Sequence, residues 1–200
     1  MLRETFIGRV PSHFKLNRIV EAFIISETFF WAAWNFITPI FAIFVISDIK
    51  GGNIQIAASA FSCYLITRVI FEVFAGRYST GKSDLHKLWM TILGMLMLSI
   101  AYIGFSFSHS ITQLFLFYVI TGIAIGIATP AKNSLFSAHL DPDKEPTEWG
   151  IYDAITLLGI ALATALGGFI ASAYGFQPLF LLAALINILG IIPYIIYIGV

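Results

Sequence analysis

The stretch ITQLFLFYVITGIAIGIATPA, residues 111–131, contains no acidic or basic side chain in 21 positions. A bilayer core is ~30 Å thick and an α-helix rises ~1.5 Å per residue, so about 20 mostly apolar residues cross it. The stretch therefore predicts a helix that spans a membrane. Five further stretches of the chain have the same character, and together they decide the fold class.

The composition agrees with a membrane protein. Of the 200 residues, 58% are hydrophobic and 11% are charged, whereas soluble domains have about 45–50% and about 25%. The predicted spans are residues 19–46, 54–74, 88–107, 111–131, 150–174 and 179–198. We therefore predict an all-α bundle of six transmembrane helices over residues 19–200, preceded by a basic N-terminal segment over residues 1–18.

Local signals at the predicted helix ends support this division. Asn53 suits the N-cap of the second helix, and Ser110 with Gln113 forms a capping-box pattern at the start of the fourth. Gly175 and Pro178 separate the fifth and sixth helices.

The distribution of basic residues predicts the orientation. Three segments that would share one side of the membrane carry nine lysines and arginines: Arg3, Arg9, Lys15, Arg18, Arg77, Lys82, Lys87, Lys132 and Lys144. The other side carries only Lys50. Because cytoplasmic loops are enriched in such residues, we predict cytoplasmic N- and C-termini in a plasma membrane. The basic segment 1–18 is interpreted either as a topology-setting tail or as an amphipathic surface segment.

An internal repeat is visible in the first and fourth helices. Thr38-Pro39 and Thr129-Pro130 occupy similar places along these two helices. The chain then divides into two three-helix units, residues 19–107 and 111–198, and the second unit enters the membrane from the opposite side. Proline-interrupted helices at matching places of such inverted repeats point to a binding site.

Several motifs resemble the major facilitator superfamily, at the level of one six-helix half. Gly122, Gly126, Pro130 and Ala131 are similar to its glycine-rich fourth helix, residues 157–168 to its fifth helix, and residues 175–180 to its turn between helices 5 and 6. The resemblance implies secondary transport of a small solute by alternating access. It also implies that this chain pairs with a second six-helix bundle, as a homodimer or a heterodimer.

One loop departs from the pattern of that family. The signature G-x-L-A-D-R-x-G-R-K between helices 2 and 3 falls on residues 72–78, where Ala75 and Arg77 match. Glu72 and Gly76 stand where the signature has Gly and Asp. A cytoplasmic latch from Asp153 to Arg77 or Lys132 is one expectation here; the other is that Asp153 only complements a helix N-terminus.

Ionisable residues within spans are costly in lipid, so they usually face protein or water. Glu27 in the first helix and Arg68 in the second lie at similar predicted depth, and Glu72 follows Arg68 by one turn. We predict a Glu27–Arg68–Glu72 charge cluster. Two interpretations stay open, namely proton or substrate coupling and a structural ion pair.

Two helix faces are candidates for the substrate path. The first helix supplies Glu27, Trp31, Trp34, Asn35 and Thr38, and the fourth supplies Tyr118, Gly122, Gly126, Thr129, Pro130 and Asn133. Their spacing places each set on one side of a helix. The resemblance implies that both helices line a central cavity, although tryptophans also favour membrane interfaces.

A stripe of small residues, Gly159, Ala163, Gly167 and Ala171, recurs every four positions in the fifth helix. Such stripes allow close helix contact, either within the chain or in a dimer. We predict no catalytic residue, cofactor, metal site or nucleic-acid partner. The bilayer and an unidentified small solute are the other expected partners. The alternative function is a non-transporting scaffold or accessory subunit; a third possibility is a remnant of a longer transporter.

Overall fold

The structure is a computed structural model that describes residues 16–197. Its helices are α2 (Arg18–Ile37), η2 (Thr38–Ile40), α3 (Phe41–Asp48), α4 (Ile54–Ser79), α5 (Asp84–Ser106), α6 (Ile111–His139), α7 (Glu145–Tyr174), α8 (Phe176–Leu189) and α9 (Ile191–Tyr197). Most of the predicted basic segment, residues 1–15, lies outside the described residues. Six helical segments are long and apolar enough to cross a membrane, which confirms the predicted fold class.

The first and sixth segments are each built from more than one helix. α2, η2 and α3 form the first segment, and α8 and α9 form the sixth. The fourth segment is longer than predicted, because α6 continues to His139 instead of ending at residue 131. Lys132 therefore lies inside a helix and not in a loop.

Three of the signals predicted for helix ends are confirmed, whereas Pro178, predicted to help separate the fifth and sixth helices, lies in the first turn of α8. The Asn53 side chain accepts a hydrogen bond from the backbone N–H of Ile56 at 2.9 Å. Ser110 and Gln113 form the reciprocal capping box at the start of α6. Gly175 has a φ of 84° between α7 and α8, a conformation that L side chains rarely adopt.

The two Thr-Pro pairs have different outcomes. Pro39 ends α2 and begins the short 3₁₀ segment η2, whereas α6 continues through Pro130. A proline cannot donate a hydrogen bond to the carbonyl four residues before it, which is that of Asn35 for Pro39. The Thr164 hydroxyl of α7 donates to this carbonyl at 3.3 Å. A neighbouring helix thus satisfies the freed backbone group, as the lipid environment requires.

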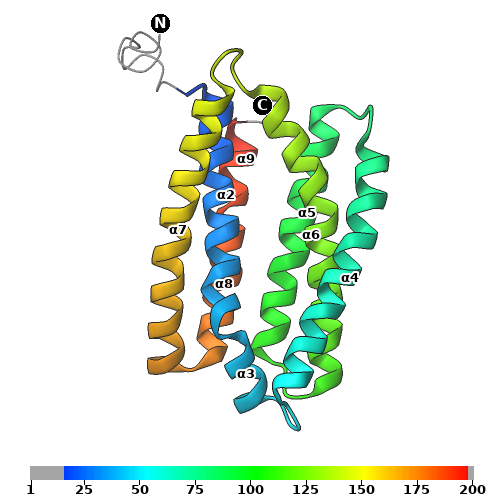
Figure 1. The fold of residues 1–200 in the computed structure, drawn as a ribbon, viewed down its shortest axis with the longest axis vertical. Coiled ribbons are helices and arrows are strands. Elements are labelled where there is room, and N and C mark those ends of the chain that lie inside the picture. The colour runs from blue at the N-terminus through cyan, green and yellow to red at the C-terminus, as the bar shows by residue number, and fades with distance from the viewer. Residues whose placement is uncertain (1–15, 198–200) are drawn as a thin grey trace, which may run out of the picture.

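The two three-helix units interlock (Figure 1). α2 packs against α7 and α8 of the second unit, and α6 packs against α4 and α5 of the first. In the repeat, α2 corresponds to α6, α4 to α7 and α5 to α8, so the contacts of α2 are the counterparts of the contacts of α6. The corresponding helices α5 and α8 also pack against each other. The first helix of each unit is therefore held between two helices of the other unit, as expected for a pseudo-twofold repeat.

α4 and α7 occupy opposite flanks of the bundle and are its least buried spans (Figure 1). Each carries large apolar side chains on its outer face, such as Val69 and Phe74 on α4 and Leu158 and Leu162 on α7. α5, in contrast, is mostly buried. The two flanking helices therefore offer their outer faces to lipid or to a second bundle.

Candidate functional site

A buried ion pair joins the first helices of the two units. The Lys132 ammonium on α6 contacts the Glu27 carboxylate on α2, and their side chains are only 2% and 1% exposed. α2 and α6 otherwise make few contacts with each other. We call this pair, with the tyrosines that contact it, the Glu27–Lys132 site.

Two tyrosines complete the coordination of the carboxylate. The Tyr194 hydroxyl of α9 donates to Glu27 Oε1 at 3.1 Å, and the Tyr152 hydroxyl of α7 donates to Oε2 at 3.4 Å. Both carboxylate oxygens therefore have partners, as a buried charge requires. Four helices, α2, α6, α7 and α9, meet at one carboxylate.

Aromatic rings cover the Lys132 ammonium. Its Nζ lies 4.0 Å from the centroid of the Phe30 ring and 5.0 Å from that of Trp31, within the range of cation–π attraction. Trp31 thus contacts Lys132, whereas Trp34 lines the cavity described below. The site can hold one negative and one positive charge away from water. If Glu27 took up a proton, Lys132 would lose its counter-ion.

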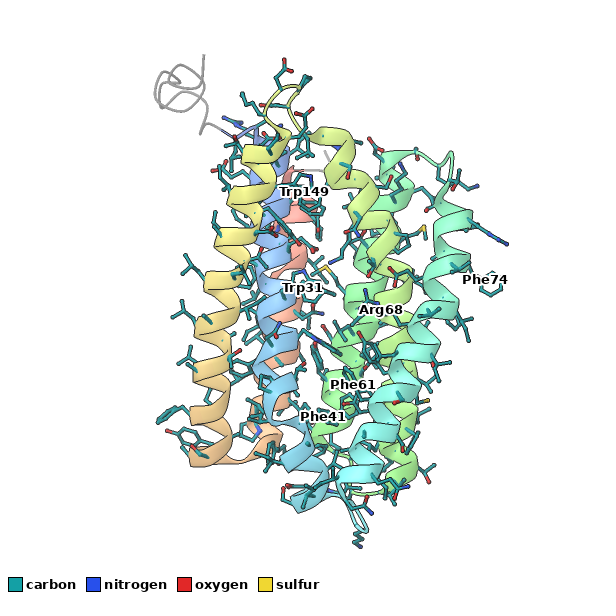
Figure 2. The ribbon with its side chains drawn as sticks, viewed as in Figure 1. Trp31, Phe41, Phe61, Arg68, Phe74 and Trp149 are labelled. Atoms are coloured by element: carbon teal, nitrogen blue, oxygen red, sulfur yellow. The ribbon has the colours of Figure 1, made fainter. Side chains whose placement is uncertain are left out.

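The predicted three-membered charge cluster is wrong as a single unit. Arg68 Nε lies 3.0 Å from Glu72 Oε2, and Arg68 Nη1 donates to the Tyr64 hydroxyl at 3.2 Å. Arg68 and Glu72 stay on α4, about one quarter and one third exposed. Trp31, one turn after Glu27, lies at a height similar to that of Arg68 along the bundle (Figure 2). The two charge groups are nevertheless separate, because Glu27 takes Lys132 as its partner.

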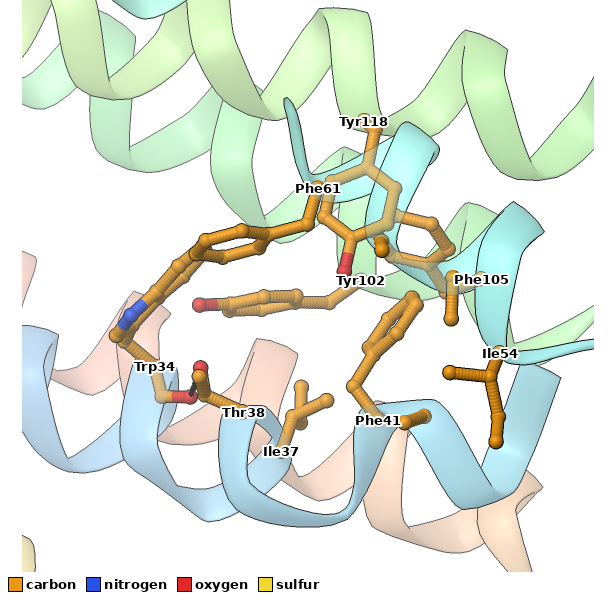
Figure 3. A pocket seen from close by; sticks show the side chains of 12 residues that line it. Trp34, Ile37, Thr38, Phe41, Ile54, Phe61, Tyr102, Phe105 and Tyr118 are labelled. Atoms are coloured by element: carbon orange, nitrogen blue, oxygen red, sulfur yellow. Dashed lines mark hydrogen bonds between the residues drawn. The ribbon is translucent and has the colours of Figure 1, made fainter. Parts of the chain in front are cut away.

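A cavity of about 340 Å³ lies in the half of the bundle that contains η2 and α3 (Figure 3). Its walls come from α2, η2, α3, α4, α5 and α6. Trp34, Thr38, Phe41, Phe61, Tyr102 and Tyr118 are among its 12 lining residues. Among the lining residues no side chain is an acid, a lysine, an arginine or a histidine. The cavity can therefore hold an apolar or aromatic molecule.

The predicted substrate-path residues divide into three groups. Trp34, Thr38 and Tyr118 line the cavity. Glu27 and Trp31 belong to the Glu27–Lys132 site. The third group consists of residues of the predicted faces that the structure places elsewhere: Asn35, Gly122, Gly126, Thr129, Pro130 and Asn133.

Most members of this third group serve the helices themselves. Gly122 and Gly126 lie directly against the backbone of α4, so we assign them to helix packing. The amide of Asn35 donates to the carbonyl of Trp31 at 2.9 Å, and the Thr129 hydroxyl donates to that of Ile125 at 2.7 Å. Pro130 faces Gly76 on α4, and Asn133 is exposed.

The small-residue stripe of α7 packs within the chain. Gly159 lies against the Thr28 side chain of α2, and Gly167 lies against the Phe36 carbonyl of the same helix. Ala163 between them is buried, and Ala171 packs against the core. The stripe was predicted to form a helix contact either within the chain or in a dimer. The structure supports a contact within the chain, which we call the seam between α2 and α7.

Comparison with known proteins decides the family. The sequence model of the Major Facilitator Superfamily matches residues 23–200. The chain belongs to the major facilitator superfamily. It is therefore a membrane-spanning member of a transporter family, in contact with the lipid bilayer.

Two curated relatives from this superfamily illustrate the similarity. The chain is 29% identical over 82 residues to the bacillibactin exporter of Bacillus subtilis, covering 41% of this chain and 20% of the relative. It is 24% identical over 147 residues to the quinolone resistance protein NorA of Staphylococcus aureus, covering 74% and 35%. The chain thus matches about a fifth to a third of the length of these relatives.

A solved structure confirms the fold. The chain superposes on the crystal structure of the POT family transporter PepTSo with a TM-score of 0.73 at 13% sequence identity. The match covers 90% of this chain and 37% of that transporter. The six-helix bundle is thus similar to less than half of a longer superfamily fold.

The latch expected from the superfamily's loop signature does not form. Arg77 and Asp153 are both exposed and belong to α4 and α7, on opposite flanks of the bundle. Among residues 16–197 no ion pair joins them. Asp153 is an exposed carboxylate at the ninth residue of α7, more than two turns past the helix N-terminus, so the expectation that it complements that N-terminus is also wrong.

A different polar cluster lies at the end of the bundle where α2 begins. The Asn17 amide donates to the carbonyl of His139 and to Asp141 Oδ1, both at 2.9 Å. Lys144 Nζ lies 2.9 Å from Asp141 Oδ2, and the backbone N–H of Asp141 donates to Glu148 Oε2 at 2.9 Å. The start of α2 is thereby tied to the loop between α6 and α7. The hydrogen bond from Lys144, followed by that from Asn17, lowers the pKa of Asp141.

Three residues that contact Glu27 in the structure, Lys132, Tyr152 and Tyr194, were not predicted from the sequence. Lys132 was assigned to a loop, because hydropathy falls at Lys132 and Asn133. The apolar Leu135 and Phe136, one turn further on, were the signal that the helix continues. Tyr152 and Tyr194 carried no signal of their own, because a tyrosine in a span is common at interfaces.

Proposed function

We propose that this chain is one half of a secondary active transporter, and that it moves a small solute by alternating access after pairing with a second six-helix bundle. The observation that carries the proposal is the buried Glu27–Lys132 pair. Burying two charges costs several kcal/mol per ion, roughly, and apolar residues in their place often stabilise a protein equally well. An intramembrane ion pair is therefore better explained by function than by stability.

The pair also lies where movement would act on it. It connects α2 with α6, which otherwise barely touch, and reaches α7 and α9 through two tyrosine hydroxyls. A change in the charge of Glu27 would alter the balance among four helices. We infer that protonation of Glu27, or binding of a charged solute group, changes the packing between the two units.

Further charged groups lie close to the Glu27–Lys132 site on two helices, α4 and α7. Lys132, Tyr152 and Tyr194 contact Glu27 directly from α6, α7 and α9. Arg68 and Glu72 on α4 act on Lys132 and pair with each other, and Asp153 on α7 acts on Tyr152. Protonation of Glu27 would leave Lys132 as a single uncompensated cation.

The exposed flanks support pairing with a second bundle. α4 and α7 are the least buried spans, and the curated relatives are several times longer than the segments that match. A twofold axis along the membrane normal would produce two parallel bundles around a midplane site. We propose a homodimer of this kind, or a heterodimer with another half. The proposed orientation has cytoplasmic termini in a plasma membrane, as the basic loops indicate.

Transport is tested in proteoliposomes. Uptake of a quinolone, the compound class in the name of the Staphylococcus aureus relative, is measured with and without a pH gradient, alongside a panel of neutral aromatic solutes. We expect at least one solute whose uptake rises with the gradient. Glu27→Gln should remove the dependence on the gradient, and Glu21→Gln, at an exposed position of the same helix, is the matched control.

The alternative is a scaffold or accessory subunit. It is favoured by the last turns of α4, where Glu72 and Gly76 replace two signature residues. Two results together would support the scaffold and contradict transport. The unmodified protein would take up no solute in the panel, and a folded Glu27→Gln protein would still assemble with its natural partner.

A further inference from the structure

We propose that the cavity beside η2 binds an uncharged aromatic molecule that carries a hydrogen-bond acceptor, with the Tyr102 hydroxyl as the donor that orients it. The inference deepens the proposed function, because it rests on that function and names the chemistry of the solute. Its test is a binding measurement, so it can fail or succeed separately from transport.

The walls of the cavity select for an aromatic molecule. Phe41, Phe105 and Tyr118 form a continuous group of rings, with centroids 4.8 to 5.3 Å apart. Trp34 and Phe61 close the opposite side (Figure 3). Aromatic rings prefer edge-to-face and offset contacts with further rings. A cavity of about 340 Å³ is at the small end of the range for ligand pockets, which fits a molecule of one or two rings.

The lack of ionisable partners selects for an uncharged molecule. None of the lining residues carries a formal charge at neutral pH. The Glu27–Lys132 pair involves no lining residue, and its charges satisfy each other. A charged ligand would therefore be buried without a counter-ion, which is strongly unfavourable.

The Tyr102 hydroxyl supplies the polar contact. The Tyr102 side chain is only 2% exposed, and its hydroxyl finds no hydrogen-bond partner within residues 16–197. Figure 3 shows the hydroxyl pointing across the cavity towards Trp34. A buried hydroxyl without a partner is costly, so a ligand acceptor placed here gains the hydrogen bond that the protein leaves unmade.

A second hydroxyl on the lining cannot substitute for Tyr102 as donor. The Thr38 hydroxyl already donates to the carbonyl of Trp34 at 2.7 Å. Its proton is therefore engaged, and its oxygen can only accept from a ligand. The lining has one further hydroxyl, that of Tyr118, which is not among the buried polar atoms left without a partner. The Tyr102 hydroxyl is, so we assign it as the donor that distinguishes a ketone from a hydrocarbon of the same shape.

The experiment compares two probes of matched shape, 2-acetonaphthone and 2-ethylnaphthalene. Saturable quenching of tryptophan fluorescence is titrated in lipid nanodiscs, with empty nanodiscs correcting for partition into lipid. We expect the ketone to bind about three- to tenfold more tightly than the hydrocarbon, the range that one hydrogen bond supplies. Trp34→Phe should remove most of the saturable quenching, because Trp34 lines the cavity.

Variants locate the preference. Tyr102→Phe should reduce ketone binding to the level of the hydrocarbon and leave hydrocarbon binding unchanged. Tyr174→Phe, at an exposed position of α7, should change neither. Ala58→Phe, on the cavity wall, should abolish saturable binding of both probes, which provides a second test if Tyr102→Phe does not fold.

Two results would overturn the inference: no saturable binding, or a ketone preference that persists in folded Tyr102→Phe protein. Tyr102-dependent binding in a protein that transports nothing supports the inference and contradicts the proposed function. Transport of another solute by a protein whose cavity binds neither probe supports the proposed function and contradicts the inference.

Discussion

Glu27 and Lys132 each carry a buried charge that is neutralised by the charge of the other. Removing one charge leaves its partner unpaired, which typically costs about 3–5 kcal/mol, whereas replacing both is often neutral. We expect Lys132→Met to lower the free energy of unfolding by about 3 kcal/mol. The double variant Glu27→Gln with Lys132→Met should recover most of that loss, because the introduced amide would remain within reach of the hydroxyls of Tyr152 and Tyr194.

These stabilities are compared by thermal unfolding in nanodiscs, and the same variants are assayed for gradient-driven uptake. A double variant that is stable but inactive supports coupling, the first of the two interpretations left open by the sequence. A double variant as unstable as Lys132→Met indicates instead that the pair holds the helices together. Glu21→Gln again provides the control on α2.

Asp141 makes stability depend on pH at the loop between α6 and α7. Hydrogen bonds from Lys144 and Asn17 lower its pKa in the folded protein, so its contribution is present above the unfolded-state pKa of about 4. That contribution is lost as the pH falls through the lower, folded-state pKa. The stability difference between the unmodified protein and Asp141→Asn should therefore shrink steadily below about pH 4.

Thermal unfolding from neutral pH down to about pH 2 measures this difference. Asp143→Asn is the matched control, because Asp143 is exposed and its φ of 67° is one that Asn tolerates. A difference that stays constant across the whole range would show that the Asp141 carboxylate contributes through its shape rather than its charge.

At the scale of helices, Gly167 and Gly168 offer a test of the seam between α2 and α7. A methyl group at Gly167 would overlap the Phe36 carbonyl, whereas one at Gly168 would meet nothing within 4 Å. We expect Gly167→Ala to destabilise the bundle by about 1–3 kcal/mol, the usual cost of overpacking. Gly168→Ala should be neutral within about 0.5 kcal/mol. Unfolding temperatures measured side by side check this, and equal effects would contradict the seam.

The same helices show what the sequence could predict. Apolar length predicted all six spans, and the Asn53, Ser110 and Gly175 signals predicted where helices begin or end. Hydropathy failed at Lys132, because it measures the cost of side chains in lipid. Lys132 is buried in protein and balanced by Glu27, so α6 continues past it.

The wrong partner for Glu27 has a related cause. Glu27 and Arg68 were paired because consecutive helices are usually neighbours in space. Here the two units interlock, so α2 packs mainly against α7 and α8, and α6 lies between α4 and α5. That exchange depends on how whole helices pack, and no single residue reports it. The cavity was predicted only in part, because Tyr102 comes from α5, a helix outside the two predicted faces.

At the scale of the whole molecule, the outer faces of α4 and α7 predict how two bundles would meet. These helices lie on opposite flanks and run in opposite directions. We place a twofold axis along the membrane normal, against the face of the bundle that lies between the two flanks. Rotation about this axis keeps every residue at the same height in the membrane and exchanges the left and right flanks. As a result, α4 of one chain faces α7 of its partner. Two α4 helices would then lie on opposite sides of the dimer.

Mass and cross-linking test this arrangement together. Native-lipid nanodiscs should contain a defined dimer of about 44 kDa, twice the 22.1 kDa chain. The single natural cysteine, Cys63, is first replaced by serine. Cysteines are then placed at the exposed positions Val69 or Val73 on α4 and Leu158 or Leu162 on α7.

We expect at least one combination of an α4 cysteine with an α7 cysteine to give a cross-linked dimer, while the corresponding single-cysteine proteins stay monomeric on denaturing gels. The physical reason is that only the α4–α7 pairing brings these positions together at equal height. Cross-linking by α4 cysteines alone would place the axis elsewhere. A purely monomeric mass would mean that the second wall of the transport path comes from a different chain, and co-purification from native membranes would then identify it.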